Sequence, residues 1–229
     1  MRTMISSLSQ VEAVLFDLDG TLVDTNIDFP LMKRELCALA SKEGLPAAEL
    51  ARLDILAMVD EGARQLQFLG KLEQAKRFRS SALAKLEEIE LRHAATASEV
   101  PGARELVARL KAKGIKVGIV TRNCRSASEL ALRLVGIEPD VLVCREDCSA
   151  CKPHPDQLHV ALTKLGANPS YSVMIGDHIM DVQSGNAAGL MNIGLLRDNK
   201  PCNFFDNAKP DLVVRSLTEV MRAIIGDNC

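Results

Sequence analysis

This chain of 229 residues has few aromatic side chains, which make up 3% of it, and it has no tryptophan. It also lacks a basic excess, because 28 Lys and Arg stand against 30 Asp and Glu, for a formal net charge of −2. Proteins that bind nucleic acids use cations to neutralise phosphates and often stack aromatic rings on bases. We therefore expect no nucleic-acid partner.

Long apolar runs are missing as well. No stretch approaches the roughly 18 consecutive apolar residues of a membrane-spanning helix. The first ten residues, MRTMISSLSQ, contain no long apolar segment followed by a cleavage site of small residues, as a secretion signal would. We expect no membrane partner and a cytoplasmic protein.

The cysteine content does not suit a disulfide framework. Seven cysteines are an odd number, and a chain of this length, 47% hydrophobic, can bury a large core without covalent staples. Cys144, Cys148 and Cys151 have the spacing Cys-x3-Cys-x2-Cys, which is compatible with a metal cluster or with redox-sensitive thiols. A fourth ligand at a convincing spacing is missing, so we favour free thiols and leave the choice open.

From residue 101 onward, short β-branched runs alternate with helical patterns. The expected strands are IKVGIVT, DVLVC, YSVMIGD and LMNIGLL, and the first strand of the chain would be EAVLFD near its start. The expected helices between them are PGARELVARLKAKG, SASELALRLVG, PDQLHVALTKLG and IMDVQSGNAAG. This alternation favours an α/β fold with a Rossmann-like, doubly wound parallel sheet covered by helices on both faces.

Residues 26–98 break the alternation, because they contain helical patterns and no convincing strand. In the last of these patterns, apolar residues recur every three or four positions and form a stripe that needs a packing partner. The stripe consists of Leu72, Ala75, Phe78, Ala82, Leu86 and Ile89. We expect a catalytic core of residues 1–25 and 99–229 and an inserted α-helical domain of residues 26–98.

Polar residues stand where the expected strands end or where helices begin. In chain order they are Asp17, Asp19, Thr121, Lys152, Asp177 and Asp181. The carboxyl ends of parallel strands meet at one edge of a sheet, and ligands bind there, so we expect these side chains to gather at that edge. Carboxylates, a hydroxyl and an ammonium in one place suit a divalent cation and an anionic substrate.

The segments FDLDGT, GIVTRN, KPHP and GDHIMD stand in the order of the motifs of the haloacid dehalogenase superfamily of phosphohydrolases, and the chain resembles that family. The resemblance covers residues 11–25 and 100–197. The insert after the first strand is similar to the helical cap of phosphatases like phosphoglycolate phosphatase. The resemblance implies a phosphatase that uses Mg²⁺, forms an aspartyl-phosphate and acts on a small phosphorylated metabolite.

Roles for the acidic residues follow from the same resemblance. Asp17 would be the nucleophile, and Asp19 would be the general acid and base, which a dehalogenase lacks because its leaving group needs no proton. Mg²⁺ would bind to Asp17, to the backbone carbonyl of Asp19 and to Asp177. Asp181 would orient the water molecules around the metal.

Thr121, the backbone amide of Arg122, and Lys152 would hold the phosphoryl group. A phosphoglycolate-like compound or a sugar phosphate would be the substrate, although nothing in residues 26–98 selects one. The alternatives are a phosphomutase of the β-phosphoglucomutase kind, a pyrophosphatase, and a catalytically silent regulatory module, which the filled motif positions disfavour. We expect a monomer or a homodimer.

Overall fold

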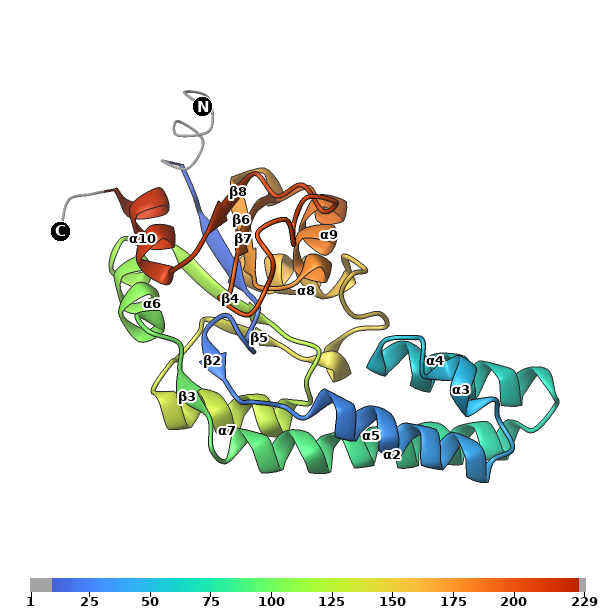
Figure 1. Ribbon diagram of the computed structural model, residues 1–229. Coiled ribbons are helices and arrows are strands. Elements are labelled where there is room, and N and C mark those ends of the chain that lie inside the picture. Colours follow the sequence, from blue (N-terminus) through green and yellow to red (C-terminus); the bar gives the residue numbers. More distant parts are fainter. Residues whose placement is uncertain (1–9, 227–229) are drawn as a thin grey trace. The chain divides into compact units, whose positions relative to one another are not determined.

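A computed structural model describes residues 10–226 of the chain (Figure 1). The chain divides into two compact units. Of the described residues, 10–25 and 95–226 form the first, which we call the sheet unit, and Asn26–Ala94 form the second, which we call the helical unit. Within the described part of the chain, no helix is both long enough and apolar enough to cross a membrane.

The sheet unit is built on one parallel sheet with the strand order β5-β4-β1-β6-β7-β8 (Figure 1). Its strands are β1 (Ala13–Phe16), β4 (Lys116–Val120), β5 (Val141–Val143), β6 (Ser172–Gly176), β7 (Met191–Leu195) and β8 (Leu212–Val214). The central strand β1 pairs with β4 on one side and with β6 on the other, and all four of its side chains are buried. The α/β fold expected from the alternation is therefore confirmed.

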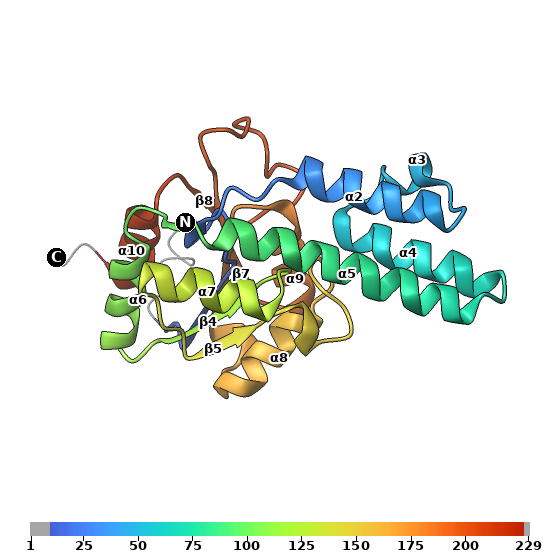
Figure 2. The same cartoon turned by 90° about the horizontal axis from the view of Figure 1, so that it is seen from below.

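Within residues 10–226, α-helices accompany this sheet (Figures 1 and 2). They are α6 (Ala103–Ala112), α7 (Arg125–Val135), α8 (Asp156–Leu165), α9 (Ile179–Ala188) and α10 (Leu217–Ile225). Helices α8 and α9 pack together over one face of the sheet, whereas α6 packs against α10. Strand β8 and helix α10 were not among the expected elements. The apolar spacing of Leu217, Val220, Met221 and Ile224 in α10 was an available signal, whereas β8 has only three residues, one of them exposed.

A short antiparallel pair joins the ends of the two segments that make up the sheet unit. It consists of β2 (Val23–Asp24) and β3 (Ser98–Glu99), with Asp24 opposite Ser98. Residues 95–98 therefore group with the sheet unit, although the sequence pattern assigned them to the insert. A two-residue strand carries too few side chains to be recognised from its sequence.

The helical unit contains four helices: α2 (Phe29–Lys42), α3 (Ala47–Leu50), α4 (Ile55–Phe68) and α5 (Leu72–Ala94). Asp28 and Asp54 cap the N-termini of α2 and α4 by accepting hydrogen bonds from backbone amides. The expected stripe on α5 is buried from Ala75 to Ile89, but its first member, Leu72, is 59% exposed. Leu72 opens the helix and thus lies at the edge of the core that the other stripe residues share.

Two phenylalanines of the helical unit provide a matched test of this core. Phe78 is 3% exposed and its ring lies 2.5 Å from where a Cβ on Gly62 would be, whereas Phe68 is 87% exposed. We expect Phe78→Ala to lower the free energy of unfolding by about 3–5 kcal/mol, because it leaves a cavity. Phe68→Ala should change it by less than about 0.5 kcal/mol. Urea denaturation followed by circular dichroism measures both, and equal losses would contradict this packing.

Candidate active site

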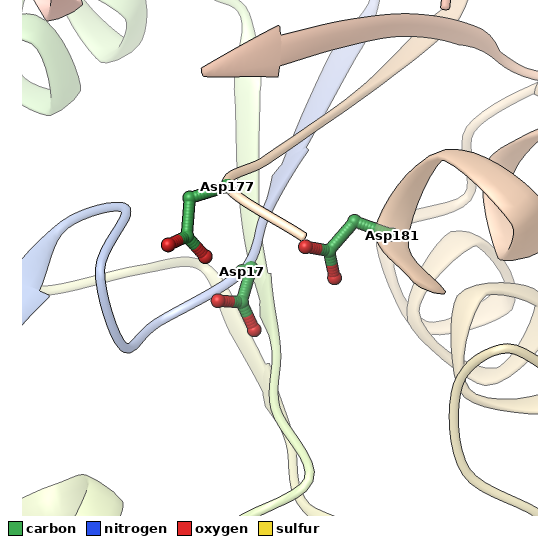
Figure 3. A group of neighbouring side chains, drawn as sticks. All are labelled: Asp17, Asp177 and Asp181. Atoms are coloured by element: carbon green, nitrogen blue, oxygen red, sulfur yellow. The ribbon is translucent and has the colours of Figure 1, made fainter. Parts of the chain in front are cut away.

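Three carboxylates meet at the carboxyl edge of the sheet (Figure 3). Asp17 directly follows β1, and its backbone amide donates a 2.9 Å hydrogen bond to the carbonyl of Ile175 in β6. Asp177 directly follows β6, and Asp181 lies in the first turn of α9. One oxygen from each of these acids lies within 4.8 Å of the others. After β1 the chain continues to β4 on one side of the sheet, and after β6 it continues to β7 on the other, so this edge lies where the strand order reverses, the usual ligand position in such folds.

Lys152 places a buried ammonium between two of these acids. Its Nζ donates hydrogen bonds of 2.6 Å to Asp17 Oδ1 and 2.7 Å to Asp181 Oδ1, and its side chain is 2% exposed. Burial by itself would lower the pKa of Lys152, but the charges of Asp17 and Asp181 outweigh it and raise this pKa. The lysine is therefore charged when these two acids are ionised.

The positive charge of one lysine does not offset three carboxylates. Burial raises the pKa of Asp177 to about 7, and the charges of Asp17 and Asp181 act in the same direction. Burial also raises the pKa of Asp17 to about 6, against the lowering effect of Lys152. A divalent cation would relieve this repulsion, and a donor set made only of oxygens fits Mg²⁺.

The carboxylate of Asp19 has different partners. The hydroxyl of Thr25 donates a hydrogen bond to Oδ1, and the side-chain amide of Asn123 donates one to Oδ2. Among residues 10–226, the acidic group that could hold a metal ion consists of Asp17, Asp177 and Asp181, without the side chain of Asp19. The hydrogen bonds from Thr25 and Asn123 thus hold the side chain of Asp19 in one orientation.

Thr121 and Arg122 follow β4 and contribute to the same edge. Thr121 is 2% exposed, and its hydroxyl oxygen accepts a 3.2 Å hydrogen bond from the amide of Asn123. The guanidinium of Arg122 points to the first turn of α9, where Nη1 lies 2.8 Å from the sulfur of Met180. All the residues expected at the site therefore belong to the sheet unit, and the fold brings their segments to one edge.

Gln157 was not singled out in the sequence, although it joins two of these segments. This residue of α8 is fully buried, its Nε2 donates a 2.7 Å hydrogen bond to the carbonyl of Thr121, and its Oε1 accepts a 3.0 Å bond from the amide of Lys152. An amide on the apolar face of PDQLHVALTKLG was the available signal, because a buried polar group must find partners. Asn123, which binds Asp19, offered no comparable signal in the loop.

The cysteines before Lys152 do not assemble a metal site in the described part of the chain. Cys144, Cys148 and Cys151 are free thiols, and none belongs to a group of three potential metal ligands. Burial raises the pKa of Cys144 and of Cys148 to about 12, and it also raises the pKa of Cys151. Oxidation proceeds through the thiolate, which burial disfavours at these three cysteines.

Comparisons with known proteins agree on one family. A family model described as haloacid dehalogenase-like hydrolase matches residues 14–195. Pyrophosphatase PpaX of Bacillus pumilus (strain SAFR-032) is 29% identical over 223 residues, which are 95% of this chain and 98% of that protein. Pyrophosphatase PpaX of Oceanobacillus iheyensis is 26% identical over 220 residues, with the same coverage. The crystal structure of a HAD phosphatase from Thermococcus onnurineus is 26% identical, with a TM-score of 0.63 and coverage of 96% of this chain and 100% of that one.

Proposed function

We propose that this chain, which belongs to the haloacid dehalogenase-like hydrolase family, is a phosphatase that releases inorganic phosphate from a small phosphorylated metabolite. The observation that carries the proposal is the buried ammonium of Lys152 between Asp17 and Asp181, with Asp177 beside them. This arrangement combines a carboxylate nucleophile with charges that suit a phosphoryl group and a cation. The phosphatase and pyrophosphatase names of the relatives support it.

In the first step, a carboxylate oxygen of Asp17 attacks phosphorus and the bond between phosphorus and the leaving oxygen breaks. Asp17 needs no base to activate it once ionised. Asp19 gives its proton to the leaving oxygen, so that the product leaves as a neutral hydroxyl where the substrate is an ester. Thr25 and Asn123 hold the carboxyl group of Asp19 in place for this transfer.

In the second step, Asp19 takes a proton from a water molecule whose oxygen attacks the phosphorus of the aspartyl-phosphate. The bond between phosphorus and Asp17 breaks, inorganic phosphate leaves, and Asp17 is restored as a carboxylate. One acid therefore serves both half-reactions, first as an acid and then as a base. The site returns to its starting protonation state after each turnover.

The phosphoryl group needs stabilising contacts throughout both steps. We assign these to the hydroxyl of Thr121, the backbone amide of Arg122 and the ammonium of Lys152. In the described structure, the Thr121 hydroxyl accepts a bond from Asn123 but donates none, so its proton is available for a phosphate oxygen. Contacts aimed at developing charge commonly contribute about a hundred- to a thousandfold in turnover each.

Mg²⁺ would be held by Asp17, Asp177 and the backbone carbonyl of Asp19. When bound, it offsets the repulsion between the carboxylates and the negatively charged substrate. Both oxygens of Asp181 already accept hydrogen bonds, one from Lys152 and one from the amide of His178. We therefore assign Asp181 to orienting the water molecules around the cation, close enough to ligate it directly if they are displaced.

The helical unit would act as a cap that excludes water and selects the substrate. A phosphomonoester of the phosphoglycolate or sugar phosphate kind is the first candidate, and pyrophosphate is the second, because the relatives named above are pyrophosphatases. A phosphomutase would use the same aspartyl-phosphate on a second hydroxyl. A silent binding module would not need every catalytic position filled.

Phosphate release from a panel of phosphomonoesters and pyrophosphate, with Mg²⁺ or with EDTA, tests the function. We expect release with at least one compound and its loss in EDTA. Borohydride reduction of the quenched enzyme should convert residue 17 to homoserine, which mass spectrometry detects as the trace of an acyl phosphate. Isomers of a hexose 1-phosphate without inorganic phosphate would indicate a mutase, and no reaction with any compound would favour the silent module.

Gly20 allows a separate test of the carboxylate cluster. It has φ of +78°, and a Cβ there would lie 2.5 Å from Asp177 Oδ2, whereas Gly44 has φ of +72° and nothing within 4 Å of such a Cβ. Gly20→Ala and Gly44→Ala should each cost about 1–2 kcal/mol of folding free energy from backbone strain. Only Gly20→Ala should also weaken Mg²⁺ binding and phosphate release, because it displaces Asp177. Calorimetric Mg²⁺ titration distinguishes the two variants. Unchanged Mg²⁺ binding in Gly20→Ala would show that Asp177 does not hold the cation.

A further inference from the structure

The loop between β7 and β8, residues 196–211, brings a cation to the edge of the site. Lys200 lies over the ring of Phe204, with its Nζ 4.7 Å from the ring centroid. The ring of Phe204 in turn contacts that of His178 edge-on, with 5.9 Å between the centroids. Because His178 directly follows Asp177, this chain of contacts leads from the loop cation to one of the three site carboxylates.

The loop is anchored on both sides of Lys200. After it, Phe205 is 3% exposed, and its ring packs so closely on β7 that a Cβ on Gly194 would lie 2.9 Å from it. Before it, Arg197 donates 3.0 Å hydrogen bonds to both carboxylate oxygens of Asp24. These contacts fix the place of the cation next to the site.

The charge of Lys200 influences Asp177 and His178, and among the described residues no carboxylate forms an ion pair with it. Burial raises the pKa of Asp177 and lowers that of His178, and Lys200 lowers both. Lys200 is half-buried as a residue, and its ammonium makes no hydrogen bond or ion pair with any residue in the range 10–226. Arg122, whose Nη1 lies 2.8 Å from the sulfur of Met180 in the first turn of α9, also lowers the pKa of His178. A partly desolvated cation gains most from an anion that a ligand supplies.

We propose that Lys200 binds a second anionic group of the substrate, on its leaving-group side. The site would then favour phosphate compounds whose leaving group is itself charged, such as pyrophosphate or phosphoglycolate, over sugar phosphates with a neutral leaving group. Lys152 and Thr121 already serve the transferred phosphoryl group, which leaves Lys200 for the rest of the molecule. The inference rests on the proposed phosphatase function and narrows its substrate class.

Lys200→Met in the full chain tests the assignment, because methionine keeps an apolar stem against Phe204 and removes the charge. We compare kcat/KM for pyrophosphate and phosphoglycolate with that for glucose 6-phosphate. The ratio of charged to neutral substrates should fall about ten- to a hundredfold, the size expected for a hydrogen bond to a charged group. For phosphoglycolate the loss should lie in KM, because the carboxylate keeps its charge during the reaction. For pyrophosphate kcat should fall as well, because the leaving phosphate gains charge.

Two variants control for charge and fold. Lys200→Arg keeps the cation and should preserve most of the substrate preference. Lys164→Met makes the same charge change at the end of α8. The neighbouring Leu165 accepts a hydrogen bond from Lys116, the first residue of β4, so Lys164 lies at the opposite end of the sheet from the site. This control should leave the ratio unchanged.

The outcomes distinguish failure of the Lys200 assignment from failure of the proposed phosphatase function. Equal losses for charged and neutral substrates in Lys200→Met would mean that the lysine acts through Asp177 or the fold, and would overturn the assignment. An unchanged ratio without any loss would overturn it as well. A wild-type chain that releases phosphate from none of these compounds would instead refute the proposed function, and the inference with it.

Discussion

Asp17→Asn is expected to abolish phosphate release, with a fall in turnover of about ten-thousandfold or more, as for loss of other enzymatic nucleophiles. Asparagine has nearly the same shape as aspartate and can still accept a hydrogen bond from Lys152. It cannot form the acyl phosphate, because its amide lacks the anionic oxygen that attacks phosphorus. Phosphate release under saturating substrate, together with borohydride trapping at residue 17, measures the effect.

The fold should tolerate this change. Burial and the neighbouring Asp181 disfavour ionised Asp17. A neutral asparagine there loses the ion pair with Lys152, but it also removes the repulsion from Asp181 and the cost of burying a charge. Asp206→Asn is a matched control, because Asp206 is an exposed acid of the sheet unit outside the site. The control should keep wild-type turnover. Full activity in Asp17→Asn would refute the mechanism, whatever the substrate.

Lys152→Met is expected to affect both catalysis and stability. Loss of the ammonium removes a contact to the phosphoryl group, which should lower turnover by about a hundred- to a thousandfold. It also leaves Asp17 and Asp181 buried without their common cation. Removing one partner of a buried ion pair costs about 3–5 kcal/mol, and because Lys152 is only 2% exposed, little solvent screening reduces that cost.

Magnesium provides the control for this second prediction. Because a divalent cation would replace part of the missing positive charge, the loss of stability in Lys152→Met should be smaller in Mg²⁺ than in EDTA. Urea denaturation of both proteins under the two conditions measures the difference. Lys164→Met, on the surface of α8, should leave the unfolding free energy unchanged within about 0.5 kcal/mol. Equal stability of wild type and Lys152→Met in EDTA would show that the bonds to Asp17 and Asp181 contribute nothing to folding.

The elements that sequence patterns could predict are those with a strong local signal. The central strands are continuous apolar runs because both of their faces are buried, and the helices between them have clear apolar stripes. Strands β2 and β3 have two residues each and were not expected, since their pairing depends on neighbours that are distant in the chain. Strand β8 was missed as well, whereas β5, equally short, was found because DVLVC lies between two clear helical patterns. Leu72 had the right spacing but is the first residue of α5 and remains mostly exposed.

The site residues also divide into those with a local sequence signal and those whose role depends on tertiary contacts. Asp17, Asp19 and Asp177 could be found because strand ends are visible in the sequence and parallel strands end at one edge. The side chains of Gln157 and Asn123 act through hydrogen bonds to residues that are remote in the chain or in another element, so periodicity could not assign them. Lys200 belongs to the same class, because its place depends on how Phe204 meets His178.

The order of residues along the chain was enough to determine the parallel α/β core, the acids at its strand ends and their resemblance to one family, because these follow from local periodicity and from the geometry of parallel sheets. Only the tertiary structure decided that Asp17 and Asp181 both accept a hydrogen bond from the ammonium of Lys152. Lys152 and Asp17 are 135 positions apart, yet a single ammonium lies within hydrogen-bond distance of Asp17 and Asp181. Such electrostatic pairing depends on distances of a few ångströms in a buried site, and these are set by packing rather than by spacing in the sequence.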